Sequence, residues 1–463
     1  MPKISTDRFH PEIERNKYMN EIKQNKMQTM PIPALIISMS LPMMLSMLIQ
    51  ALYNIVDSIY ISRVSDAALT AVSLAFPLQT SVIALGVGTA VGINSLLSRR
   101  LGEQKTEEAT HVAETGIFLS LVTYVIVAIL GLLLSRSYVM MFTKDEELVG
   151  LTLTYLHIVM GISFGIFIEL ACEKILQGTG DTFHPMVMQL LGAITNIILD
   201  PIFIFTFDLG IAGAAYATVI GQIFSMIASI YFVRRNKYIS VRLRNIKPRK
   251  KIVKEIYQVA LPTIIMNSIG TIMTSALNAI LIAFSATAVS IFGIYFKLQS
   301  FIFMPLFGMN SALTPILGFN YGARNRKRMM EAIRWGLVIA VSIMLLGTLI
   351  FNIYPDKLLS LFNASDEMLS YGVPALKIIS LHFVSAAFSI ILISTFQAMG
   401  LGYISMIVSI LRQLVILIPS AFILSRFLGV NDVWYSFIVG ELVALTFCVL
   451  MFIKVYRSKI KTL

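Results

Sequence analysis

The sequence predicts an all-α membrane protein in which twelve transmembrane helices form two six-helix lobes, related as parallel repeats. Three observations predict this fold class. Hydrophobic residues make up 57% of the 463 residues and charged residues only 13%, whereas soluble domains are about 25% charged. Apolar stretches long enough to span a bilayer recur along the chain. Matching residues also recur at a constant separation of 220. The composition excludes both a soluble globule and a disordered chain.

Each expected span is long enough to cross a hydrocarbon core about 30 Å thick. Helices are expected because the chain lacks the alternating pattern of a membrane β-barrel. The domains predicted are a polar tail at 1–33, an N-lobe at 34–234, a basic linker at 235–253, a C-lobe at 254–457 and a short tail at 458–463. The spans themselves are predicted at 34–62, 67–98, 112–134, 147–176, 183–206, 212–234, 254–283, 287–318, 330–353, 369–397, 403–427 and 432–457.

The distribution of lysine and arginine predicts the orientation. The loops on the side of the N-terminus hold 28 of these residues, and the opposite loops hold 5. Because basic residues stay in the cytoplasm, both termini are expected there, with the chain a multi-pass protein of the cell membrane. The net charge of +12 is then mostly a topology signal. It predicts contact of the linker with anionic lipid and no nucleic-acid partner.

The internal repeat relates the two halves without gaps over most of their length. Six spans per half is an even number, so both halves enter the membrane from the same side. Transporters with such parallel repeats place their substrate sites at the repeat interface, and a monomer is expected. Matching residues include Phe76 and Phe296, Gln79 and Gln299, Gly88 and Gly308, Gly102 and Gly322, and Gln177 and Gln397.

Four polar side chains inside the N-lobe spans predict a cation site. Asn196 and Asp200 share one helix face, since they are four residues apart. Asp57, Asp200 and Thr218 each lie about 8–9 Å below the outer surface, from the rise per residue of a helix. Membrane carboxyl groups are expensive to bury, and these oxygens suit either a proton or Na⁺. The corresponding C-lobe residues are Leu277, Ile416, Ser420 and Phe437, so the site is expected in one lobe only.

Other polar residues in the spans are candidates for contacts with a ligand. Gln50, Tyr53, Glu169 and Asn278 are expected to line a substrate cavity, where flexible methionine and aromatic side chains suit adaptable apolar pockets. An alternative for Glu169 is a packing role.

Four further charged residues have mainly structural interpretations. Glu173 and Lys174 are close enough to the inner interface to extend toward water. Lys297 and Glu441 are expected to form a structural ion pair. Proline is expected to bend several spans, above all at Pro201, next to Asp200.

These residues and motifs resemble the multidrug and toxic compound extrusion (MATE) family, in particular its DinF- and MepA-like branches. The resemblance covers about residues 30 to 457. It implies a V-shaped pair of lobes, drug/cation antiport without a cofactor, and a cation site at Asp57, Asn196, Asp200 and Thr218. Other branches use acids in the seventh and tenth helices, which are missing here. The motifs are Asp57, Gln177-Gly178-Thr179-Gly180-Asp181-Thr182, Asn196-x-x-x-Asp200-Pro201 and Leu209-Gly210-Ile211-x-Gly213-Ala214-Ala215.

The leading hypothesis is therefore a secondary multidrug efflux transporter that exchanges amphipathic, cationic drugs for H⁺ or Na⁺ by alternating access. The choice between the two ions stays open. The alternative is a lipid-linked saccharide flippase of a related superfamily, for which fourteen spans and a larger cationic cavity are expected. An enzyme is not expected, because the chain has no metalloprotease, serine-hydrolase or intramembrane aspartyl-protease motif.

Overall fold

The computed structural model describes residues 25–242, 248–362, 364–427 and 429–463, and these residues form helices and connecting loops without a strand. Ten helices are long and apolar enough to cross a membrane, and two bent helix pairs raise the number of spans to twelve. The expected all-α fold with twelve spans is confirmed for the described residues. The polar tail lies mostly outside them, as does the middle of the linker.

The N-lobe contains six spans preceded by a short helix, α2 (Lys26–Thr29). Its last helix leads into the linker. The spans are α3 (Ile32–Ser62), α4 (Asp66–Gly102), α5 (Thr106–Val139), the pair α6 (Glu146–Gly161) and α7 (Phe164–Gly178), α8 (Phe183–Pro201) with the π-helical extension η1 (Ile202–Thr206), and α9 (Gly210–Arg234).

The C-lobe repeats this order. The linker described up to residue 242 and from 248 leads into α10 (Lys250–Ile282), followed by α11 (Ala286–Gly322) and α12 (Arg326–Ile353). The remaining elements are α13 (Pro355–Ser360), the pair α14 (Asp366–Ser380) and α15 (Phe383–Ala398), the continuous rod of α16 (Gly402–Ile410), π-helical η3 (Leu411–Leu417) and α17 (Ile418–Phe427), then η4 (Val430–Asp432), α18 (Tyr435–Val455) and η5 (Tyr456–Ile460).

Helix boundaries confirm the parallel repeat. Helices α4 and α11 are both 37 residues long, and their first residues are equivalent positions of the repeat. Each helix begins after a serine N-cap, Ser65 or Ser285. The serine hydroxyl accepts a hydrogen bond from the backbone amide three residues later, at Ala68 or Ala288. The turn that ends each bent pair contains a glycine with positive φ, Gly180 at 93° and Gly400 at 78°, a conformation that glycine adopts without strain.

Two spans that the sequence predicts as unbroken helices are sharply bent. The fourth span bends by 46° between α6 and α7, and the tenth bends by 42° between α14 and α15. Neither break is at a proline. The tenth span does contain a proline, Pro374, but this residue lies inside α14 and not at the break. The bends occupy equivalent places in the repeat, so they belong to the fold of a lobe.

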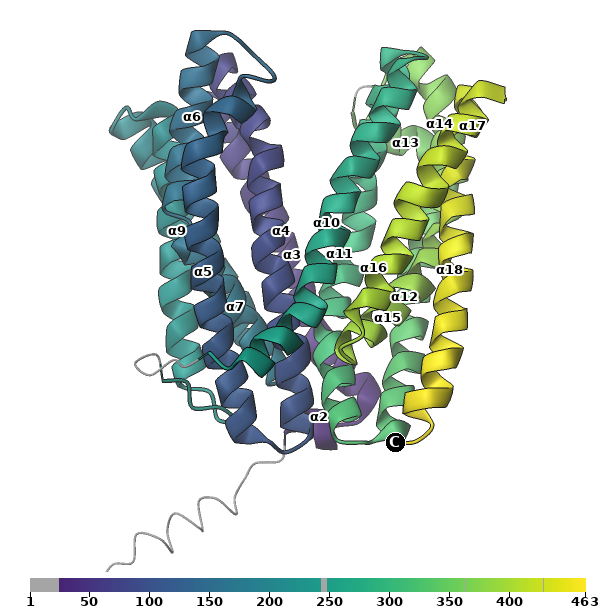
Figure 1. The fold of residues 1–463 in the computed structure, drawn as a ribbon. Helices are drawn as coiled ribbons and strands as arrows, with labels where there is room; N and C mark the ends of the chain where they lie inside the picture. The colour runs from purple at the N-terminus through teal and green to yellow at the C-terminus, as the bar shows by residue number, and fades with distance from the viewer. Residues whose placement is uncertain (1–24, 243–247, 363, 428) are drawn as a thin grey trace, which may run out of the picture.

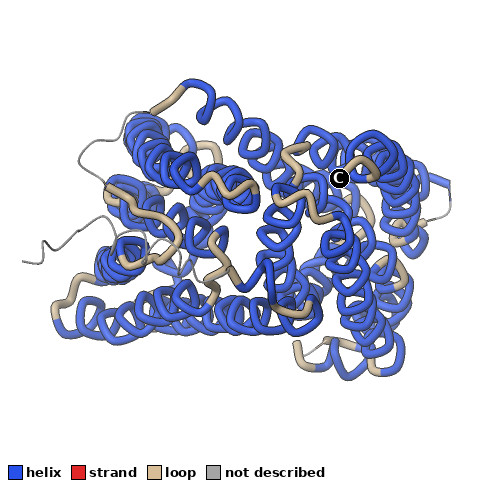
Figure 2. Tube along the Cα trace, turned by 90° about the horizontal axis from the view of Figure 1, so that it is seen from below, coloured by secondary structure: helices blue, strands red, loops and turns tan. Residues whose placement is uncertain are grey.

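The two lobes form a V that is closed at the end where the C-terminus lies and diverges at the other end (Figure 1). Seen from below, the helices gather in two bundles side by side (Figure 2). Helices α3 and α4 pack against α10 and α11 across the boundary. A Cβ on Gly88 would lie 2.4 Å from a side-chain carbon of Ile264, and one on Gly308 would lie 2.8 Å from the backbone of Met44. Glycines of both lobes therefore allow the helices of one lobe to pack closely against those of the other.

The N-terminal segment closes the base of the V. Asn25 donates a hydrogen bond of 2.9 Å to the carbonyl of Thr179 in the N-lobe. Arg328 of the C-lobe donates to the carbonyls of Met27 and Met30 at 3.0 and 2.7 Å. Because Met27 is fully buried, helix α2 joins the lobes at this end.

Candidate functional site

The four residues of the expected cation site gather near the divergent end of the N-lobe. Asp200 is the last residue before Pro201, and the backbone continues there into the wider π-helical turns of η1. The side-chain amide of Asn196 donates to Oδ1 of Asp200 at 3.3 Å and to Oγ1 of Thr218 at 3.4 Å. The proline removes one backbone donor, which accounts for the local change of helix type. Asn196 thus joins α8 to α9.

Three oxygen atoms at this site are buried and accept no hydrogen bond: Oδ1 of Asp57, Oδ1 of Asn196 and Oδ2 of Asp200. Asp57 belongs to α3 and lies within electrostatic range of Asp200 and Tyr53. Buried polar atoms normally have partners. The arrangement can therefore hold a proton or a small hard cation. Among the described residues no cluster of three or more His, Cys, Asp and Glu side chains offers a transition-metal site.

A pocket of about 120 Å³ lies beside these residues in the N-lobe. Three of the four expected substrate-contacting residues, Gln50, Tyr53 and Glu169, line it. Its other polar residues are Glu173, Gln189, Asn196, Thr218, Gln222 and Ser225. The pocket and the cation site therefore share Asn196 and Thr218.

Asn278 is not among the residues that line this pocket, and its contact with a substrate stays a prediction. It lies on α10 in the other lobe and lines neither the N-lobe pocket nor the C-lobe cavity. Met273, five residues earlier, does line the C-lobe cavity. Five residues correspond to a turn of about 140° around a helix, so Asn278 faces away from that cavity.

The acids on α7 have defined partners. Glu169 accepts a hydrogen bond from Ser225 at 2.5 Å. Glu173 accepts from Gln177 at 2.6 Å and from Lys174 at 3.1 Å. Glu173 and Lys174 are 4% and 9% exposed, so the prediction that they reach toward water is wrong. The reason is tertiary, since Gln177 and Gln189 supply the hydrogen bonds that water would have supplied.

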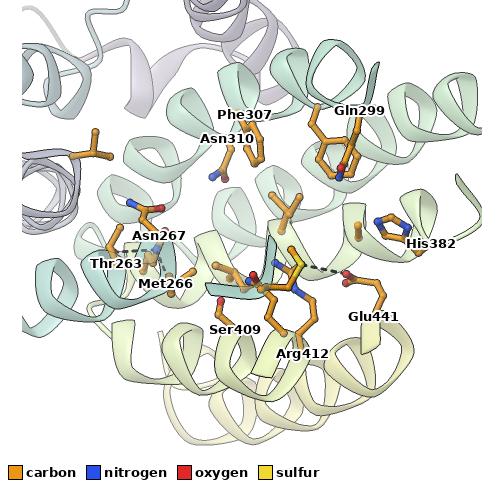
Figure 3. Close-up of a pocket in the computed structure, with 18 of the residues that line it drawn as sticks. Thr263, Met266, Asn267, Gln299, Phe307, Asn310, His382, Ser409, Arg412 and Glu441 are labelled. Atoms are coloured by element: carbon orange, nitrogen blue, oxygen red, sulfur yellow. Dashed lines mark hydrogen bonds and ion pairs between the residues drawn. The ribbon is translucent and has the colours of Figure 1, made fainter. Parts of the chain in front are cut away.

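The expected ion pair between Lys297 and Glu441 is also wrong. Glu441 pairs with Arg412 on η3, Nη1 to Oε2 at 3.2 Å (Figure 3). Lys297 is exposed and lies 5.8 Å from the ring of Phe362. Phe296 lines the C-lobe cavity, and the next residue on a helix points about 100° away. The presence of Arg412 in the same lobe was a visible signal for the correct pairing.

Comparison with known proteins identifies the family. The sequence profile of the MatE family matches the chain twice, at residues 42–202 and 262–423. The two matches begin at equivalent positions of the two halves, as the repeat requires. The chain belongs to the MatE family. It is therefore a multi-pass membrane transporter, and membership confirms the resemblance recognised in the sequence.

Curated MatE relatives are multidrug export proteins named MepA. The protein from Staphylococcus aureus strain bovine RF122 is 26% identical over 415 residues, which cover 89% of this chain and 91% of the relative. The protein from Staphylococcus saprophyticus is 26% identical and covers 87% and 89%. These relatives match the DinF- and MepA-like branch expected from the motifs.

Solved MatE structures have the same fold. A multidrug resistance MATE transporter in an outward-facing conformation superimposes with a TM-score of 0.88 at 30% identity and covers 95% of this chain and 99% of its own. A transporter of the MOP superfamily from Pyrococcus furiosus, described as having a binding pocket of reversed polarity, gives the same score and identity and covers 94% and 99%.

Proposed function

We propose that this protein is a secondary multidrug efflux transporter of the cell membrane, which exports amphipathic, cationic molecules in exchange for H⁺ or Na⁺. Family membership and the MepA relatives support multidrug export. The coupling site is assigned to Asp57, Asn196, Asp200 and Thr218. The protein acts as a monomer, with both termini in the cytoplasm and lipid around the two lobes.

One observation carries the coupling assignment. The oxygens of Asp57, Asn196 and Asp200 that lack a hydrogen-bond donor are clustered in one lobe. A buried acceptor without a partner costs free energy, and two neighbouring carboxylates repel each other. A bound proton or Na⁺ relieves both penalties. Such an ion therefore stabilises the arrangement of helices that brings the acids together.

The shared residues supply a physical route from ion to cargo. Asn196 and Thr218 belong to the ion site and also line the adjacent pocket. An ion that recruits the side-chain oxygens of these residues changes the polar groups presented to a drug. A ligand shifts a conformational equilibrium only through its different affinity for the two states. Exchange of ion for drug follows when the ion and the drug prefer different arrangements of Asn196 and Thr218.

The packing of the lobes supports alternating access. The lobes touch through glycine contacts at one end and diverge at the other. The excess of lysine and arginine assigns the closed end to the cytoplasm. The described arrangement then corresponds to an outward-facing state, and separation of the lobes at the base gives the inward-facing state.

Efflux of a cationic dye from proteoliposomes tests the proposal. The purified chain is reconstituted, and dye movement is followed under an imposed pH gradient and, separately, under an imposed Na⁺ gradient. We expect dye to move against the ion in one of the two experiments. Dye movement that neither gradient changes would overturn the coupling and leave facilitated diffusion.

The structure does not favour the flippase alternative. Up to twelve spans are present in the described residues, whereas fourteen were expected of such a flippase. Among the described residues, the N-lobe pocket is lined by no lysine or arginine, and the C-lobe cavity is lined by one, Arg412, which is paired with Glu441. Binding of a lipid-linked saccharide precursor at micromolar concentration, with no response to cationic dyes, would reverse this choice.

A further inference from the structure

The C-lobe contains a second and larger cavity, of about 430 Å³. It lies among α10, α11, α15, η3 and α18 and is closed on one side by Met47, Val87 and Val91 of the N-lobe. Its volume falls in the range that holds drug-sized ligands. Four phenylalanines and three methionines give it an adaptable apolar wall: Phe296, Phe303, Phe307, Phe437, Met47, Met266 and Met273.

The two cavities are equivalent under the internal repeat. Nine of the fourteen residues lining the N-lobe pocket have a repeat partner that lines the C-lobe cavity. The helix crossings match as well, since Gly221 packs on the carbonyl of Gly192 and Gly440 packs on the carbonyl of Arg412. The pairs include Tyr53 and Met273, Gln189 and Ser409, Gly192 and Arg412, Thr218 and Phe437, and Gln222 and Glu441.

The polar groups of the two cavities differ. The N-lobe pocket contains the acids Glu169 and Glu173 and, among the described residues, no basic side chain. At the repeat positions of Gly192 and Gln222, the C-lobe cavity contains Arg412 and Glu441. The C-lobe cavity therefore contains a pair of opposite charges, together with apolar side chains and further polar ones such as Asn267, Gln299 and His382.

This ion pair is incompletely satisfied. Within the described residues Arg412 makes one hydrogen bond, to Glu441, although a guanidinium group carries five donors. Oε1 of Glu441 is buried and accepts none. The Arg412 side chain is 25% exposed, whereas that of Glu441 is 3% exposed. The remaining donors of Arg412 are thus open to a molecule inside the cavity, and Glu441, which lines the same cavity, keeps one buried acceptor without a partner (Figure 3).

We propose that the C-lobe cavity is a second cargo site, and that it selects amphipathic zwitterions, with a carboxylate on Arg412 and an ammonium group on Glu441. A purely anionic ligand would make two carboxylates share the one guanidinium of Arg412, and a purely cationic ligand would make two cations share the one carboxylate of Glu441, so either leaves a net charge in the cavity without a counter-charge. Uncompensated buried charge is strongly unfavourable. A zwitterion supplies both counter-charges at once, and a carboxylate matches the planar donors of arginine.

This inference rests on the proposed transport function, but its test needs no ion gradient. Three fluorescent probes with the same dansyl group differ only in charge: Nε-dansyl-lysine is zwitterionic, dansylcadaverine is cationic and dansylaminohexanoic acid is anionic. Binding of each to the purified full chain in detergent is measured by fluorescence titration. We expect the zwitterion to bind at least about tenfold more tightly than either singly charged probe.

Variants then locate the site. Arg412→Gln and Glu441→Gln are each expected to weaken binding of dansyl-lysine at least about tenfold, because each leaves one charge unpaired. Arg426→Gln is the matched control, since Arg426 is exposed at the end of α17 and lines neither cavity. Equal binding of the three probes, or equal losses in Arg426→Gln and Arg412→Gln, would overturn the inference.

Photo-crosslinking of the wild-type chain with a photoreactive derivative of dansyl-lysine gives a second test. Because this test uses no variant, a folding defect cannot affect it. Labelled peptides are expected from η3, α11 and α18. Labelling confined to α7, α8 and α9 would assign the zwitterion to the N-lobe pocket and refute the proposal. Loss of gradient-driven dye efflux would refute the transport function instead, so the two failures are distinguishable.

Discussion

Gly102 and Gly322 are equivalent positions of the internal repeat and make the same contact from opposite sides of the lobe boundary. A Cβ on Gly102 would lie 2.0 Å from the carbonyl oxygen of Phe319, and one on Gly322 would lie 2.1 Å from that of Arg99. Arg99 and Phe319 are themselves equivalent under the repeat. The base of the V is therefore closed by one contact used twice, as an approximate two-fold axis requires.

Gly102→Ala and Gly322→Ala are expected to separate the lobes at this end. The obstructing atoms are backbone carbonyls, which cannot rotate away, so each methyl group costs about 1–3 kcal/mol in the closed arrangement. Spin labels on cysteines at the exposed positions Lys105 and Arg324 report the distance across the base, since the two native cysteines are buried. We expect longer distances in both variants. Gly293→Ala, on an open face of α11, serves as the control.

Asp57→Asn and Asp200→Asn are expected to reduce gradient-driven efflux at least about tenfold, within the usual range of coupling between two sites. The amides keep the shape of the side chain but cannot exchange a proton or neutralise a cation. Proteoliposome efflux is the measurement, with membrane insertion verified by protein yield. Asp208→Asn is the control, because Asp208 is exposed and asparagine tolerates its φ of 53°. Wild-type rates in both site variants would remove the acids from the mechanism.

Arg328→Gln is expected to loosen helix α2 from the base of the V. The variant loses two charge-assisted hydrogen bonds, to the carbonyls of Met27 and Met30, each worth about 1.5–3 kcal/mol. A cysteine at the fully buried position of Met27 should then react with a maleimide several times faster. Lys327→Gln, on the exposed neighbouring residue, should leave the rate unchanged. Equal rates in the two variants would show that Arg328 does not hold the segment.

Gln50→Ala and Asn278→Ala test which polar residues contact cargo. Gln50 lines the N-lobe pocket, whereas Asn278 lines neither cavity. Loss of one hydrogen bond should weaken binding of dansylcadaverine in Gln50→Ala about fivefold, or about 1 kcal/mol. Asn278→Ala should match the wild type. A larger effect at Asn278 would contradict the assignment of the pocket.

The number of spans could be read from the sequence because burial in lipid requires long apolar segments. The bends at residues 162–163 and 381–382 could not be read, although they recur in both lobes. Hydropathy indicates how long an apolar segment is, but it carries no information on whether the helix axis changes direction within that segment. The sequence predicted a bend at Pro201, where the backbone changes to the π-helical η1, because a proline removes a backbone donor from the helix itself.

Charged pairs were the least predictable feature of the site. Depth in the membrane favoured Lys297 over Arg412 as the partner of Glu441. The faces of α11 and η3 that carry the two basic residues decide for Arg412 instead. Glu173 and Lys174 were expected near water, yet Gln177 and Gln189 enclose them. The partner of a charge depends on helix rotation, which neighbouring helices decide.

The sequence by itself determined the twelve spans, the internal repeat and the polar residues of the N-lobe, because each follows from composition and spacing along one chain. Only the tertiary structure decided that Asn278 lines neither of these two cavities, that Arg412 faces Glu441, and that the two lobes carry equivalent cavities with different charges. Those properties depend on the rotation and tilt of packed helices, which the pattern of one helix does not record.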